Sequence, residues 1–155
     1  MRQLSTKSGF LPRPVSGEPL RAEATVKCYR SCDSISLRAE ARLTGTGRFD
    51  IHLSVPLVLE YEEVLLRELP RLQIGRGAVE DLIDFHCTVA TCHPIFFLWR
   101  PFLPDPGDDM ILELAVKAGC EFIVTYNTRD FAGVEQFGLR VIEPGAFLQH
   151  IGALP

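Results

Sequence analysis

The chain has 155 residues, of which 46% are hydrophobic and 23% are charged, and its formal net charge is −4. This length and composition suit one globular domain with an ordinary core and argue against a disordered or fibrous protein. No apolar run is long enough to cross a membrane, and the first ten residues lack the apolar core of a signal peptide, so we expect a cytoplasmic protein without a membrane partner.

The cysteine count and the charge give two further expectations. Five cysteines, an odd number in a chain without an export signal, predict reduced thiols rather than a disulfide framework. The acidic balance does not indicate the basic face that is typical of nucleic-acid-binding proteins. A nuclease whose site is made of carboxylates can still be acidic, because bound metal ions reverse the local sign of charge.

The first part of the chain, residues 1–46, gives few secondary-structure signals, because Ser, Gly, Pro, Arg and Thr are frequent there. Within it only residues 24–29 resemble a strand. We therefore treat 1–46 as a divergent N-terminal segment of undetermined structure and residues 47–155 as the folded domain.

Regular patterns begin at residue 49. Residues 49–53 alternate apolar and polar side chains, which predicts a strand with one buried face. A helix should follow, with Ser54 as a candidate N-cap, Pro56 in the first turn, an apolar stripe from Leu57 to Leu69, and Pro70 closing it. Residues 66–78 then read as a basic connector, and residues 79–87 as a second helix.

The second half of the chain continues the alternation of strands and helices. We expect a buried strand at 95–98, a nearly buried helix at 110–118, a strand at 122–126, a strand at 140–142 and a closing helix or turn at 144–151. The order of elements predicts an α/β fold in three layers, with a mostly parallel central sheet and helices on both faces.

Acidic and amide side chains gather at the ends of these elements. Asp105, Asp108 and Asp109 crowd a turn just before the helix at 110–118, where capping residues are usually found. Asn127 and Asp130 follow the strand at 122–126. Because ligands bind outside the carboxyl ends of strands in open α/β sheets, the acidic turn and the strand end are predicted to meet in one crevice.

Four runs of sequence resemble a known family: GRFDIHLSVPLVLEYEEVL, WRPFLPDPGDDMILELA, IVTYNTRDF and GLRVIEPGAFL. They are similar to the C-terminal half of PIN domains, in the branch of toxin–antitoxin toxin components related to VapC-like ribonucleases, and they span roughly residues 47–148. The resemblance implies an endoribonuclease that uses Mg²⁺ or Mn²⁺ to hydrolyse RNA. It also implies a cognate antitoxin protein as partner and a homodimer.

The resemblance also assigns roles to individual residues. Asp108 stands seven residues before Ala115, as the corresponding Asp does in the family, and Glu60 takes the place of the family's acidic helix residue. The implied metal ligands are Asp108, Glu60, Asp109 and Asn127, with Asp105 in support, and the implied catalytic residues are Glu60, Asp108, Asn127 and Asp130. The alternative for Asp108 and Asp109 is ordinary capping of the helix that follows, which stabilises a helix by about 1 kcal/mol.

One motif of the family is absent from the sequence. Family members carry Asp-Thr-Asn, or a close relative, at the end of the first strand. The family's usual spacing falls near Glu23 here, and Asp33 lies too close to the strand at 49–53. Two functions therefore stay open: an active ribonuclease, or a catalytically inactive PIN-like module that binds RNA or protein.

Three other groups of residues have a chemical and a structural interpretation. His86, Cys87, Cys92 and His93 could bind zinc, with Cys28 and Cys32 as remote candidates, although a cysteine on a buried helix more often acts as a small apolar residue. Trp99 and Arg100 could stack on RNA or cap the core. Three arginines of the basic connector could contact phosphates or simply face solvent: Arg67, Arg71 and Arg76.

Overall fold

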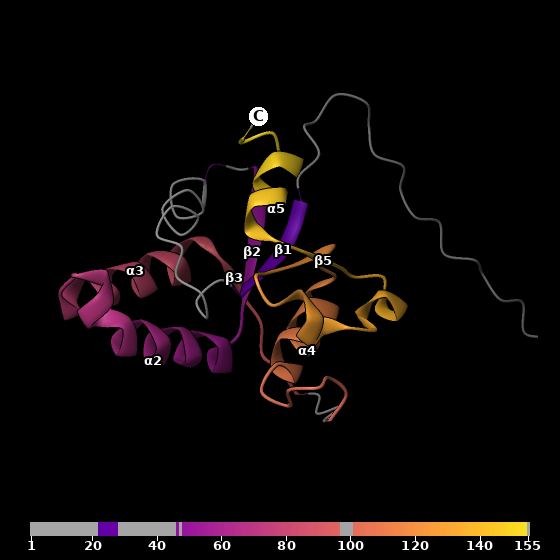
Figure 1. Cartoon of the computed structure of the whole chain (residues 1–155), viewed down its shortest axis with the longest axis horizontal. Helices are drawn as coiled ribbons and strands as arrows, with labels where there is room; N and C mark the ends of the chain where they lie inside the picture. The colour runs from indigo at the N-terminus through magenta and orange to yellow at the C-terminus, as the bar shows by residue number, and fades with distance from the viewer. Residues whose placement is uncertain (1–21, 28–45, 47, 97–100, 155) are drawn as a thin grey trace, which may run out of the picture.

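The computed structural model describes residues 22–27, of which only the backbone is considered, together with residues 46, 48–96 and 101–154. This part of the chain is built around one five-stranded sheet (Figure 1). The strands are β1 (Ala22–Lys27), β2 (Phe49–Leu53), β3 (Thr91–Cys92), β4 (Phe122–Thr125) and β5 (Arg140–Ile142). They lie in the order β3-β2-β1-β4-β5, and each of the four pairings is parallel. The predicted α/β class and parallel sheet are confirmed.

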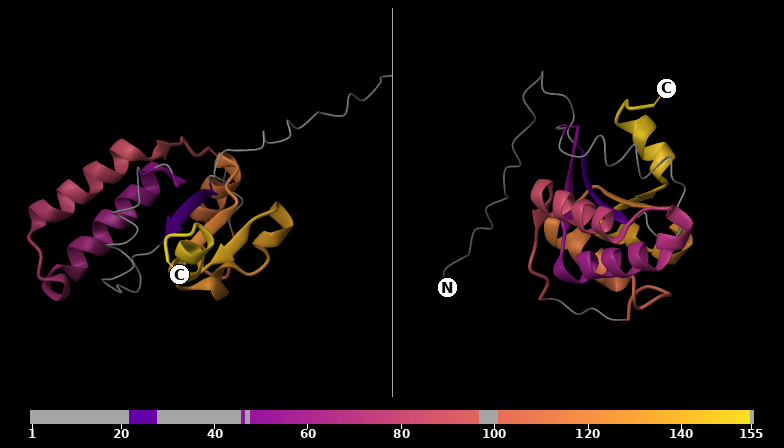
Figure 2. Two further views of the ribbon diagram at one scale, coloured as in Figure 1. Left: turned by 90° about the horizontal axis from the view of Figure 1, so that it is seen from above. Right: turned by 90° about the vertical axis from the view of Figure 1, so that its left-hand side faces the viewer.

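Helices cover this sheet. They are α2 (Val55–Leu72), α3 (Arg76–Val89), α4 (Asp109–Ala118), α5 (Pro144–His150) and two short 3₁₀ helices, η1 (Thr128–Phe131) and η2 (Val134–Phe137). α2 and α3 lie side by side in all views (Figures 1 and 2), whereas α4 packs against β1, β2 and β4. Among the described helices, none combines the length and the hydropathy needed to cross a membrane.

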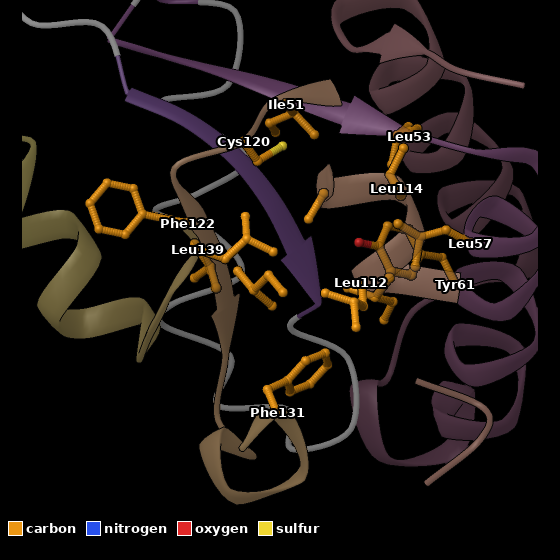
Figure 3. Close-up of a cluster of buried hydrophobic side chains, with 14 of the residues drawn as sticks. Ile51, Leu53, Leu57, Tyr61, Leu112, Leu114, Cys120, Phe122, Phe131 and Leu139 are labelled. Carbon is orange, nitrogen blue, oxygen red and sulfur yellow. The ribbon is translucent and has the colours of Figure 1, made fainter. Parts of the chain in front are cut away.

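The core shows that both faces of the sheet are covered. Phe122 and Ile123 are neighbours on β4, so their side chains point to opposite faces, yet both are fully buried. Figure 3 draws Phe122 beside α5, where its ring packs edge-on against Phe147 at 5.8 Å between centroids. Phe147 also contacts Phe49 of β2 at 5.3 Å, so α5 ties two strands of the sheet together.

The central strand comes from the N-terminal segment, whose residue pattern resembles a strand only weakly. β1 pairs with β2 through Ala24 and Ile51, and with β4 through Lys27 and Thr125. In the strand order, β2 lies next to β1 on one side and β4 lies next to β1 on the other. The carboxyl ends of β1 and β4 therefore flank the switch point at which open α/β sheets bind their ligands.

Helix α4 and the elements after it lie where the sequence predicts them. Its apolar residues are buried, and it ends at Gly119, which has a φ of 69° and whose N–H bonds to the carbonyls of Ala115 and Val116. Glycine adopts this left-handed conformation without steric cost, which explains the sharp stop. β4, β5 and α5 follow in the predicted order and close to the predicted boundaries.

Three local predictions are wrong. Pro70 does not close the first helix, because α2 continues to Leu72 and ends at Gln73, which has a left-handed φ of 53°. The predicted connector therefore belongs mostly to α2 and α3, and just three residues separate the two helices. β3 forms at Thr91–Cys92 instead of 95–98, where Phe96 is 80% exposed and residues 97 and 98 lie outside the described part.

The predicted alternation of β2 is also incomplete. Phe49, Ile51 and Leu53 are buried as expected, but His52 on the opposite face is buried as well. Its Nδ1 lies 2.9 Å from Nε2 of His93, which follows β3. The side chain of His93, which follows the neighbouring strand, thus packs on the face that the sequence pattern assigned to solvent.

Candidate functional site

The candidate site lies at the edge of the sheet where the parallel strands end. Asn127 follows β4, and Ser54 follows β2. The last residue of α4 is separated from the start of β4 by a short link, so the other end of α4 lies at the opposite edge, with the carboxyl ends of the strands (Figure 1). The first residues of α4 and the end of β4 therefore lie at the same edge of the sheet.

Asp108 and its neighbour Asp109 are the most deeply buried of the predicted site residues. Asp108 differs from Asp109 in what its carboxylate does. The side chain of Asp108 is 1% exposed at the position directly before α4. Its backbone begins the helix, since its carbonyl accepts a hydrogen bond from the N–H of Ile111 at 2.9 Å, but its carboxylate does not cap α4. A buried carboxylate is costly for a fold. Plain helix capping therefore does not explain the presence of Asp108.

Asp109 has a structural role. Its carboxylate accepts hydrogen bonds from the backbone N–H of Leu103 at 2.8 Å and from that of Phe102 at 3.2 and 3.3 Å to its two oxygens. It is 1% exposed and holds the incoming loop against the start of α4. Since both oxygens already accept bonds from the backbone, Asp109 is a weaker candidate for a metal ligand than Asp108.

Asn127 and Asp130 are brought together after β4. The side-chain amide of Asn127 donates a hydrogen bond to Oδ2 of Asp130, and its backbone N–H donates to the hydroxyl of Thr125 at 3.1 Å. Thr125 is buried, whereas Asn127 is exposed and Asp130 is half-buried. The end of β4 thus holds an amide and a carboxylate as one unit.

Glu60 lies on α2, half-buried beside the stripe formed by Leu57, Tyr61 and Val64. Figure 3 shows Leu57 and Tyr61 next to Leu112 of α4, and the two helices are in contact. Glu60 is therefore on a helix that packs beside the helix of Asp108.

The candidate residues fit a divalent metal ion only in part. Carboxylate and amide oxygens are the ligand types that Mg²⁺ prefers. Across the described residues, however, no group of three or more His, Cys, Asp and Glu side chains could share an ion. β1 ends at Lys27, and Glu23 lies toward its amino end, in register with Asp50. Glu23 is thus poorly placed to replace the family's first Asp. Asp33, the other candidate, lies outside the described residues.

The two histidines of the candidate zinc group, His86 and His93, make other contacts. Nδ1 of His86 lies 2.8 Å from the carbonyl oxygen of Leu82, and burial lowers the pKa of His86 below its usual 6.5. The ring of His93 instead contacts His52, as described above. Each histidine is thus engaged away from the two cysteines.

The cysteines of the candidate zinc group are also poorly suited to bind zinc. Desolvation raises the pKa of Cys87, and the neighbouring Cys92 and Asp84 raise it further. Zinc binds thiolates, so a raised thiol pKa weakens binding at neutral pH. The two remote zinc candidates, Cys28 and Cys32, lie outside the described residues. Trp99 and Arg100, the candidates for RNA stacking, lie outside them as well.

Two buried polar residues at or near this site were missed from the sequence. Glu113 is 1% exposed and lies on α4, four residues after Asp109. Ser54 is equally buried, and its hydroxyl has no hydrogen-bond partner among the described residues. The signal for Glu113 was available, because a glutamate interrupts an otherwise apolar helix. Ser54 was interpreted only as a helix cap, and its side chain does not cap α2.

Comparison with known protein families identifies a family for this chain. The family model described as PIN domain matches residues 34–129, more than half of the chain. The matched range contains β2, α2, α3, β3, α4 and β4, and with them Glu60, Asp108 and Asn127, whereas Asp130 is the first residue beyond it. No curated protein matches the chain.

Proposed function

This chain belongs to the PIN-domain family, and we propose that it is a metal-dependent endoribonuclease of the toxin type, which hydrolyses RNA phosphodiester bonds at the sheet edge near Asp108. PIN domains are nuclease-type folds that typically use divalent metal ions, so a nuclease follows from the family in general terms. The RNA substrate and the toxin role are our own further steps.

The observation that carries the proposal is the burial of Asp108 at the start of α4. Folds rarely bury a carboxylate that neither caps a helix nor packs as an apolar group, and such sites are often functional. Asp108 flanks the switch point of the sheet, and the linked pair of Asn127 and Asp130 follows β4 at the same edge. These oxygen-bearing groups have the chemistry that Mg²⁺ or Mn²⁺ would require.

The partners in this proposal come from the sequence resemblance. The toxin-like runs around residues 47–148 support an RNA substrate, a cognate antitoxin protein that holds the enzyme inactive, and a homodimer. A cytoplasmic location would bring the protein together with RNA and with such an antitoxin. Each of these is part of the proposal.

Two observations favour a second function. The described residues collect no set of three metal-binding side chains, and the described end of the central strand is Lys27 instead of a carboxylate. With fewer negative charges, less energy offsets the cost of stripping water from Mg²⁺. The alternative is therefore a catalytically inactive PIN-like module that binds RNA or protein without cutting.

Cleavage of RNA by the purified chain separates the two functions. A mixed, structured RNA should be cut in the presence of Mg²⁺ or Mn²⁺ and should remain intact in EDTA. Asp108→Asn should lower the rate by about 100-fold or more, in the range found for removal of a group that acts in the reaction. The control is Asp81→Asn, an equivalent change at an exposed position of α3 away from the site.

The possible results are distinct. Metal-dependent cutting that is lost in Asp108→Asn but retained in Asp81→Asn supports the ribonuclease. If a folded wild-type chain leaves every RNA intact, the inactive binding module is the better description. Equal activity of the two variants would exclude Asp108 from the reaction.

A further inference from the structure

Two phenylalanines from distant parts of the sequence form an aromatic pair at the surface. The rings of Phe102 and Phe137 lie 5.2 Å apart between centroids and meet edge-on at 74°. Each is 37% exposed, so neither ring is simply part of the core. Large exposed aromatic side chains that touch each other are uncommon unless they serve a contact.

The pair joins the two segments that carry the candidate site. The backbone N–H of Phe102 donates to the carboxylate of Asp109 at the start of α4. On the other side, a Cβ at Gly133 would lie 3.8 Å from Cζ of Phe102, and Gly133 is three residues after Asp130. The rings therefore connect the loop before α4 with the loop after β4.

Charge in these two segments does not favour a polyanion. The acidic side chains are Asp105, Asp108, Asp109, Asp130 and Glu135, and the basic residue of η1 and η2 is Arg129. Nucleic-acid affinity usually depends on Lys and Arg contacts to phosphates. Along these two described segments, contacts that do not depend on charge would therefore contribute most of the affinity for RNA. Base stacking on aromatic rings is such a contact, and unpaired RNA bases are commonly held in this way.

We propose that Phe102 and Phe137 form a stacking platform for an unpaired base of an RNA strand beside Asp108. This inference rests on the proposed function, because it names single-stranded RNA as the substrate class of the same site. The partly exposed rings supply the apolar surface, and Asp109, which accepts a hydrogen bond from the backbone of Phe102, directly follows Asp108 in the chain. Phe85 is similarly exposed, at 40%, but lies on α3 and packs against His86, so it serves as a matched control.

The test measures stacking without cleavage. The full chain carries Asp108→Asn, and the probe is a short unstructured oligoribonucleotide with 2-aminopurine at one position, whose fluorescence is quenched when the base stacks. Phe102→Leu and Phe137→Leu keep an apolar side chain but remove the aromatic face. Each should weaken binding by about 5- to 150-fold and reduce the quench, because stacking of one base spans this range. Phe85→Leu should bind and quench like the parent.

Two further measurements guard against misfolding and simple charge effects. Phe137→Tyr retains an aromatic face and should restore binding and quenching, which a general packing defect in the Leu variant would not predict. Raising the salt from about 50 to about 200 mM should weaken binding by less than tenfold, whereas complexes held by many phosphate contacts lose far more.

The outcomes separate this inference from the nuclease itself. Equal binding and quenching in the three Leu variants would overturn the stacking platform, even if the wild-type chain cuts RNA. Absence of RNA binding by the Asp108→Asn parent would overturn it as well. If the wild-type chain cuts no RNA but quenching is lost specifically in Phe102→Leu and Phe137→Leu, the platform stands and the nuclease proposal fails.

Discussion

His86 is an imidazole held inside the protein, 8% exposed, with its Nδ1 2.8 Å from the carbonyl oxygen of Leu82. Burial lowers the pKa of His86, and the hydrogen bond to Leu82 only partly opposes this shift. Below the ordinary pKa of 6.5 the unfolded chain takes up a proton, whereas the folded chain does not until the lower, folded pKa is reached. The stability contributed by neutral His86 is therefore complete above pH 6.5 and falls as the pH drops below it.

We predict that wild type loses more stability than His86→Gln when the pH is lowered from about 7.5 to about 5.5. Urea unfolding of both proteins at both pH values measures the difference, and carboxylates that titrate in both chains cancel in the comparison. An equal pH dependence of the two proteins would show that His86 is not the group responsible.

The residue types of the site could be predicted from the sequence, but their contacts could not. The spacing of Asp108 and Asp109 before an apolar helix placed both at a helix start, and both lie there. The sequence does not distinguish them, whereas the structure gives Asp109 two backbone donors and buries Asp108 without a capping role. These differences depend on how the loop at Phe102 folds back, which is a tertiary contact and leaves no local pattern.

At the scale of elements, Pro70 is the residue of α2 with the lowest helix propensity. It lies exposed in the last turn of α2, has no N–H to donate, and places its ring against the preceding turn. Pro70→Ala should raise the free energy of unfolding by about 1–3 kcal/mol, reduced by the extra freedom of the unfolded chain. Urea unfolding measures the gain, with Arg71→Ala as control, because its ion pair with Glu68 is long and exposed and should contribute less than about 0.5 kcal/mol. A loss of stability in Pro70→Ala would mean that the ring makes a packing contact.

The elements that were predicted correctly have strong internal patterns. α4 repeats its apolar residues at helical spacing, and β4 is a short run of apolar and β-branched residues, so local chemistry decides both. β1 and β3 lack such patterns. β1 has the sequence AEATVK and is a strand because β2 and β4 pair with it, and β3 is a two-residue edge strand aligned by His52 and Leu53. Pairing with neighbours far along the chain determines these strands, and β propensity alone cannot show it.

For the whole molecule, the sheet and its helices form one connected core, and this decides how the protein should unfold. The order of strands and helices in the sequence was enough to predict a parallel sheet covered on both faces, because parallel neighbours need crossovers. The relative positions of the carboxylates were harder to predict, because they depend on where the crossovers place α2 and α4 relative to the central strand. The pattern of single elements does not contain that information.

Substitution of Phe147 tests whether α5 belongs to this single core. Phe147 is fully buried in α5 and packs edge-on against Phe49 of β2 and Phe122 of β4, so one ring joins the last helix to strands on both sides of β1. Phe147→Ala should lower the free energy of unfolding by about 3–5 kcal/mol through lost burial and the cavity left behind. The control Phe96→Ala removes a ring that is 80% exposed and should change stability by less than about 0.5 kcal/mol. If α5 belongs to one cooperative core, circular dichroism and tryptophan fluorescence should report a single shifted transition for Phe147→Ala. Separate transitions, or a loss near that of the control, would mean that α5 docks on an otherwise complete domain.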